Sequence, residues 1–144
     1  MIVSLAVRTT NVTTANACWE IRTGSTPGRV KLLEIGVSLA AATATTLGLG
    51  YPAAIGVTPT SPVDFIPEDP NDVIASGVIQ SALAWGTGPT IPTAFKRRIS
   101  LQATIGAGVI FTFPKGLVIP VSSSIILWNL SATSALDAYA VLSL

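Results

Sequence analysis

The side chains that carry most acid–base, nucleophilic and metal chemistry are scarce in this sequence. It contains no histidine and a single cysteine, Cys18. Without histidine, the Ser-His-Asp and Cys-His groups that activate a nucleophile cannot form, and common zinc sites lack their ligands. Cys18 stands in an alternating apolar segment, which is typical of a small buried side chain. We therefore favour a buried thiol over a reactive or intermolecular one.

Carboxylates are the remaining candidates for chemistry. Four of the seven acids lie in or just after a Pro-rich stretch: Asp64, Glu68, Asp69 and Asp72. No spacing among them indicates a glycosidase pair, and Glu68–Asp72 has oxygens without the spacing of an EF-hand. Gly106-Ala-Gly108 lacks the third glycine and the following helix of a nucleotide-binding loop. We expect no enzyme activity, no cofactor and no metal site.

The charge content is unusually low. Charged residues make up 10% of the 144 residues, against about 25% in an average soluble domain. Few charges and a net charge of +1 favour association. This composition predicts a chain that hides part of its surface against partners. The alternative is a stable monomer coated with Ser and Thr, because much native surface is apolar anyway.

Nucleic acid and membrane are not the expected partners. The only basic cluster is Lys96-Arg97-Arg98, and three successive strand residues point to alternate faces, so no concentrated basic face forms. The segment Ile35–Val63 is uncharged, but its glycines, prolines and hydroxyls favour strands and turns over a spanning helix. Met1 leads directly into apolar residues without a basic start, so no signal peptide is predicted.

The dominant hydrophobic period is two, which is typical of strands with one buried face. In 98–105, Ile99, Leu101, Ala103 and Ile105 alternate with mostly polar residues. Segments 14–21 and 33–39 repeat the pattern, with these residues expected to face inward: Ala15, Ala17, Trp19, Ile21, Leu33, Ile35, Val37 and Leu39.

Gly- and Pro-rich turns separate these segments at short intervals. The Ala-rich stretch Leu39–Leu47 lacks helix caps. The sequence therefore predicts an all-β chain, a single domain over 1–144, folded as a jelly roll or a related antiparallel β-sandwich of about 8–10 strands.

Some strands are apolar on both faces. The segments Ile125–Leu130 and Val109–Phe113 are each expected either at the centre of a sandwich or under another subunit. The C-terminal run Ala138–Leu144 is apolar to its last residue, so we expect it docked as a strand whose edge meets a neighbour. The three tryptophans are expected in the core.

Residues 58–72 are expected to form a Pro-rich extended loop, because Pro cannot join a central sheet. This loop could be an arm that reaches a neighbouring subunit, or a solvated surface loop. Its acids balance Lys96–Arg98, which suggests an ion contact between subunits. The interface candidates are Asp64, Phe65, Ile66, Glu68, Asp69, Lys96, Arg97, Arg98, Leu142 and Leu144.

Two stretches resemble small virion proteins of tailed bacteriophages. One is Arg98-Ile-Ser-Leu-Gln-Ala-Thr-Ile-Gly-Ala-Gly-Val-Ile-Phe-Thr-Phe-Pro-Lys-Gly-Leu-Val-Ile-Pro120, and the other runs from Leu33-Glu-Ile-Gly-Val37 through an Ala/Thr-rich run to Tyr51-Pro-Ala-Ala-Ile-Gly-Val57. The resemblance implies a jelly roll or related sandwich, often trimeric, that decorates or cements a capsid shell. It brings no catalytic residues.

These observations favour a capsid decoration protein, a homotrimer bound to the major capsid protein on the outer surface of the virion. We expect two-faced strands to line the trimer axis, and synthesis in the host cytoplasm. The first alternative is a receptor- or glycan-binding sandwich of a phage tail or fibre, which would need an exposed aromatic or acidic pocket. A secreted or membrane-inserting β-protein is the second alternative.

Overall fold

A computed structural model of the chain describes residues 1–9, 16–25, 28–131 and 134–144. Within these residues the secondary structure is all β, and no helix long and apolar enough to span a bilayer is found among them. The strands are β1 Ile2–Arg8, β2 Asn16–Thr23, β3 Val30–Leu39, β4 Thr45–Gly50, β5 Val57–Pro59, β6 Pro62–Val63, β7 Ile66–Pro67, β8 Ile79–Ala82, β9 Trp85–Thr87, β10 Arg97–Leu101, β11 Gly108–Ile119, β12 Ser124–Asn129 and β13 Leu136–Ser143.

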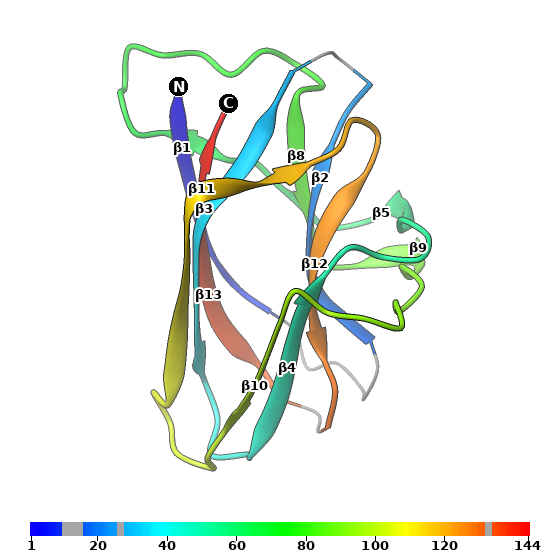
Figure 1. Cartoon of the computed structure of the whole chain (residues 1–144), viewed down its shortest axis with the longest axis vertical. Helices are drawn as coiled ribbons and strands as arrows, with labels where there is room; N and C mark the ends of the chain where they lie inside the picture. Colours follow the sequence, from blue (N-terminus) through cyan, green and yellow to red (C-terminus); the bar gives the residue numbers. More distant parts are fainter. Residues whose placement is uncertain (10–15, 26–27, 132–133) are drawn as a thin grey trace.

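Two antiparallel sheets pack face to face (Figure 1). The first sheet has the strand order β11-β3-β13-β1-β7, and the second has the order β10-β4-β12-β2-β8-β6. The longer strands β1–β4 and β10–β13 contribute four to each sheet, and the chain changes sheet at every step except from β4 to β10. This alternation and strand order are those of a jelly roll. The predicted all-β sandwich is confirmed.

The core lies between the two sheets. Val3, Leu32 and Leu142 from the first sheet meet Trp19 and Leu127 from the second, and none of them is more than 1% exposed. The expected core role of Trp19 is therefore confirmed. Burying such side chains contributes roughly 1.5–3 kcal/mol each, which is the main force that holds the layers together.

A second, smaller core lies outside the second sheet. Residues 51–60 and 84–96, which we name the cover, include β5 and β9 and lie against the outer side of β2 and β12 (Figure 1). Trp85, Ile91 and Phe95 of the cover pack on Ile126 and Trp128 of β12. Every residue of β12 is buried as a result. The two-faced strand is thus central in its sheet and covered by its own chain, so it has no face left to line a trimer axis.

A buried carboxylate fastens the cover to the sheet. Glu20 of β2 is fully buried, and its Oε2 accepts a 2.6 Å hydrogen bond from Trp85 Nε1. Its Oε1 accepts a 3.2 Å bond from the Gly56 amide, and Arg22 Nη1 lies 3.7 Å from Oε2 while donating to the Gly56 carbonyl. A buried charge is tolerated only when it is bonded in this way. These contacts fix both halves of the cover on β2.

The C-terminal strand does not present an edge. β13 pairs with β1 on one side and with β3 on the other. The expectation that its edge meets a neighbour is therefore wrong, although its docking as a strand is confirmed. β11, which contains the other two-faced run, is instead the edge strand of the first sheet.

Three details of the predicted strand faces are also wrong. A register shift at Cys18 turns Ala17 to the outer core, and a second shift leaves Leu33 half-buried while Leu32 faces inward. β10 ends at Leu101, because a turn containing Gly106 at φ +85° follows, and Ile105 is 69% exposed. Positive φ is easily adopted only by glycine. Thr14 and Ala15 lie outside the described residues.

The Pro-rich segment 58–72 returns along one side of the sandwich. β6 pairs with β8 at the edge of the second sheet, and β7 pairs with β1 at the edge of the first. Between them Phe65 is 5% exposed and stacks on Trp19, with ring centroids 6.3 Å apart. The segment thus bridges the two sheets and closes this side of the core.

We predict that Phe65→Ala lowers the free energy of unfolding by about 3–5 kcal/mol, because it empties a site in a packed core. The matched control is the neighbouring Ile66→Ala, where the side chain is 65% exposed and the expected change is below about 0.5 kcal/mol. Urea unfolding monitored by tryptophan fluorescence measures both. Equal, small effects would mean that the segment is not docked on the core.

Candidate functional site

The sandwich has two open sides where its edge strands lie. One side carries β7 and β6, and the opposite side carries β11 and β10. Most of the interface residues predicted from the sequence fall into two groups, one on each of these sides. The two groups have opposite charge.

The acidic side is formed by Asp64, Glu68, Asp69 and Asp72, all of which are exposed. Asp64 and Asp72 line the same hollow beside β8. The Asn71 amide and side chain each donate a 2.9 Å hydrogen bond to Asp69 Oδ1, which lowers the pKa of this carboxyl and favours its charged form. Ile66 is exposed on the same side, whereas Phe65 is a core residue.

The sequence predicted no concentrated basic face at Lys96–Arg98, but edge strands β10 and β11 bring these three bases to the same side as Lys115, which lies in the bulge of β11. We name these four residues the basic side. All four are exposed. The Arg97 guanidinium lies 4.9 Å from the centroid of the Phe113 ring, and Lys96 Nζ lies 5.5 Å from that of Tyr51. These cation–π contacts hold two of the charges close to the body of the domain.

The charges on the two sides have no partners of opposite sign in the described part of the chain. The ion pairs found there are Arg8–Asp137 and Arg22–Glu20. Four of the seven acids and four of the eight bases therefore stand unpaired on opposite sides of the molecule. The predicted ion contact between subunits stays a prediction.

The remaining interface candidates lie elsewhere. Leu142 is fully buried in the main core, which leaves it no surface for a partner. Leu144 is half-buried, and its amide donates a 2.9 Å hydrogen bond to the Met1 carbonyl. The two termini thus lie side by side (Figure 1).

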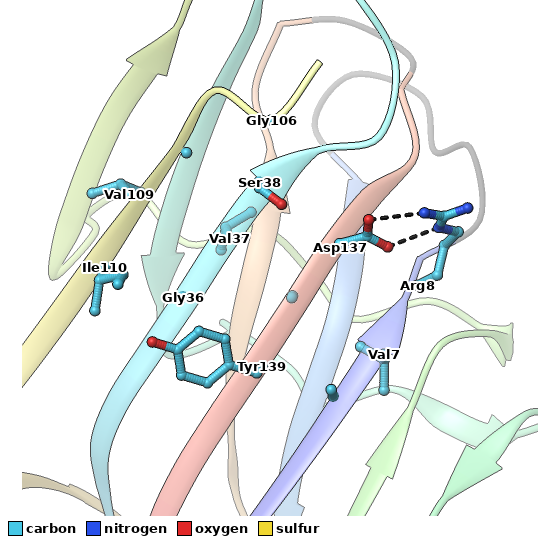
Figure 2. A pocket seen from close by; sticks show the side chains of 13 residues that line it. Val7, Arg8, Gly36, Val37, Ser38, Gly106, Val109, Ile110, Asp137 and Tyr139 are labelled. Atoms are coloured by element: carbon cyan, nitrogen blue, oxygen red, sulfur yellow. Dashed lines mark hydrogen bonds and ion pairs between the residues drawn. The ribbon is translucent and has the colours of Figure 1, made fainter. Parts of the chain in front are cut away.

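A groove runs over the outer face of the first sheet, which the cover does not reach (Figure 2). Its volume is about 820 Å³, and its lining includes Ala6, Gly36, Ser38, Ile110 and Tyr139. The strand register places Ile110, Gly36, Tyr139 and Ala6 in one row across β11, β3, β13 and β1. Gly36 and Ala6 in this row have no side chain or a small one, as do Gly108 and Ser38 in the next row. The backbone of the sheet therefore lines the groove there.

The Tyr139 ring lies over Gly36, which is the one residue in this row without a side chain. A Cβ atom on Gly36 would come within 2.1 Å of Tyr139 Cε1, so the ring can occupy this place only because residue 36 is glycine. The Tyr139 hydroxyl donates a 2.5 Å hydrogen bond to Glu34 Oε1. This bond raises the pKa of Tyr139 and fixes the orientation of the ring.

An ion pair lies at one end of the groove. Arg8 Nε and Nη2 donate hydrogen bonds of 2.7 and 2.8 Å to the two oxygens of Asp137. The pair is exposed, with 68% of the Arg8 side chain and 47% of the Asp137 side chain accessible. The bonds from Arg8 lower the pKa of Asp137, which keeps it a carboxylate at neutral pH.

Two kinds of reactive group remain to be placed, namely metal-ligating side chains and the thiol of Cys18. No group of three or more metal-ligating side chains is found there. Cys18 is fully buried, and burial raises the pKa of its thiol to about 12. The thiol is therefore protonated and shielded from reagents at neutral pH.

Known proteins offer no guide to the site. No family model matches the chain, and neither the curated proteins nor the solved structures give a match.

The groove was not predicted from the sequence. Its visible sign is Gly36, a glycine inside a strand pattern, because such a glycine often marks the close approach of another group. The partner, Tyr139, could not be named without the register of β3 and β13.

We predict that Gly36→Ala destabilises the protein by about 1–3 kcal/mol, because the added methyl overlaps the Tyr139 ring. In a Tyr139→Ala background this cost should disappear, so a double-mutant cycle measured by urea unfolding should show strong coupling. Gly88→Ala is the matched control, since a Cβ there meets nothing within 4 Å. An equal cost of Gly36→Ala in both backgrounds would contradict the contact.

Proposed function

We propose that this chain is a structural protein of a virus particle, which assembles with copies of itself on the outer surface of a capsid. Three observations support the proposal: the jelly-roll strand order, which occurs in viral capsid proteins; the resemblance of two segments to phage virion proteins; and a chain in which charged residues make up 10% of the sequence. The capsid partner is the major capsid protein.

The separation of charge on the two open sides carries the proposal. When the acidic side of one copy meets the basic side of the next, the contact joins two different surfaces, and such contacts close into rings when the rotation fits. The resemblance to phage proteins favours a ring of three. This arrangement places the acidic segment 58–72 against Lys96–Arg98 of a neighbour.

The charges would set the orientation of the copies more than the affinity. Exposed ion pairs each contribute roughly 0.2–1 kcal/mol, but opposite potentials steer encounter and suppress wrong orientations. Apolar area for the contact is available beside the acids, where Ile66 is 65% and Val73 is 82% exposed.

We predict that the triple variant Lys96→Glu/Arg97→Glu/Arg98→Glu weakens self-assembly by about tenfold or more, because Lys115 is then the one base left on the basic side and both sides of each copy are acidic. Adding Glu68→Lys, Asp69→Lys and Asp72→Lys to the same chain leaves Asp64 as the one acid of the acidic side, which exchanges the signs of the two sides and should restore assembly. Sedimentation equilibrium at micromolar concentration measures the change, and rising salt should weaken the wild-type assembly.

Arg29→Glu is the control for the charge reversal, because this exposed base precedes β3 and is not one of the four bases that form the basic side. It should leave assembly unchanged. A wild-type chain that stays a monodisperse monomer at micromolar concentration would count decisively against the ring.

Binding to a shell is a separate expectation. Purified protein added to capsids that lack it should raise the temperature at which the shells open, because a ligand that binds only the intact shell stabilises it. Differential scanning calorimetry measures this shift. Unchanged opening at saturating protein would contradict a cementing role.

The alternative location is a tail or fibre, where the chain would act as a receptor- or glycan-binding module. The two locations differ in copy number, since a decoration protein covers the shell and a fibre module is present in few copies. Quantitative mass spectrometry of purified particles separates them. A ratio to the major capsid protein near one subunit per capsid subunit supports decoration, and a ratio of a few hundredths or less supports the fibre.

A further inference from the structure

We propose that the groove on the outer face of the first sheet binds a neutral saccharide, with one sugar ring lying on Tyr139 and its hydroxyls bonded by the Arg8–Asp137 pair. This inference goes beyond the proposed function, because the groove does not use the charged residues of the two open sides. A particle protein with such a site could adhere to a glycan-coated surface.

The groove has the dimensions of a ligand site. Its volume of about 820 Å³ lies within the range of about 300–1,000 Å³ that is usual for small-molecule pockets. Backbone and small side chains form most of its floor, with Gly36, Gly108 and Ala6 among them. It is therefore apolar over most of its length, with its polar groups concentrated at Tyr139, Ser38 and the ion pair.

Tyr139 offers a flat surface that is already in place. Its ring covers Gly36 and is seen broadside in the view into the groove, so one face lies toward the sheet and the other toward the opening (Figure 2). The bond to Glu34 holds the ring in this position. An aromatic face carries partial negative charge and attracts the C–H groups that line the apolar side of a pyranose. A ring that is fixed before binding loses little entropy on binding.

The Arg8–Asp137 pair supplies donors and acceptors next to each other. Arginine has five N–H donors and a carboxylate about four acceptor positions. Two of each are used within the pair, which leaves three donors and about two acceptors for neighbouring hydroxyls of one sugar. Figure 2 shows the pair beyond Ser38, on the same face as Tyr139.

Charge selects the class of ligand. The groups around the groove are Arg8, Asp137 and the Glu34 that bonds Tyr139, so two carboxylates oppose one guanidinium. Phosphates and acidic sugars would be repelled by this balance. A neutral hydroxyl-rich ligand meets no such cost, which favours uncharged sugars over nucleic acid or anionic lipid.

The experiment is a titration of the full-length ¹⁵N-labelled chain with neutral trisaccharides of glucose, galactose, mannose and N-acetylglucosamine, followed by amide NMR shifts. We expect at least one of them to shift amides within 6–8, 36–38 and 137–139 in a saturable way. Tyr139→Ala should weaken binding by about tenfold, as expected for loss of an aromatic stacking contact. Val118→Ala, at an exposed position of β11 outside the groove, should bind as the wild type does.

Two further variants keep the test decisive if Tyr139→Ala does not fold. Tyr139→Phe keeps the ring and should retain binding within about threefold, whereas Asp137→Asn, which breaks the ion pair, should weaken it clearly.

Several results would overturn the proposal. These are the absence of binding for every sugar at tens of millimolar, shifts centred on another surface, and binding that is unaffected by the Tyr139 and Asp137 variants. Concentration-dependent broadening of the same amides without sugar would assign the face to a second copy of the chain instead. None of these results bears on assembly through the charged sides, which is measured separately.

Discussion

Strand β12 is apolar on both faces, and burying its second face is the constraint on which the rest of the molecular surface depends. The sandwich buries Ile125 and Leu127, but Ile126 and Trp128 point away from it. Leaving two such side chains in water would cost roughly 3–6 kcal/mol together. The chain meets this constraint by sending residues 51–60 and 84–96 over the second sheet, and the buried Glu20 holds them there through Trp85 and Gly56.

This solution makes the two faces of the molecule unequal. The second sheet is covered by its own chain, so the outer face of the first sheet and the two open sides remain for other molecules. The return of segment 58–72 along the β6–β7 side anchors Phe65 in the core and leaves the neighbouring acids exposed. The acidic side, the basic side and the groove are therefore lined by different residues, so the proposed assembly contacts do not use the residues of the proposed ligand site.

The sequence could predict what depends on local pattern. Hydrophobic alternation and turn residues were sufficient to predict an all-β sandwich. The apolar run at 125–130 predicted a strand either at the centre of the sandwich or under another subunit, and the structure shows β12 at the centre of its sheet. What it could not predict depends on pairing between distant strands. The register shift at Cys18, where β2 pairs with β12, turns the Ala17 side chain to the outer face of the sheet. The Tyr139 ring lies over Gly36 only because the register of β3 and β13 pairs these two residues.

The central claim is that copies of the chain meet side by side through opposite charges. Zero-length carbodiimide cross-linking of a mixture of ¹⁴N- and ¹⁵N-labelled chains tests it most directly, because it joins amines to carboxylates only at contact distance. The account predicts mixed-label peptides that link Lys96 or Lys115 to Glu68, Asp69 or Asp72. Mixed-label links confined to other positions, or no links between chains at all, would contradict it.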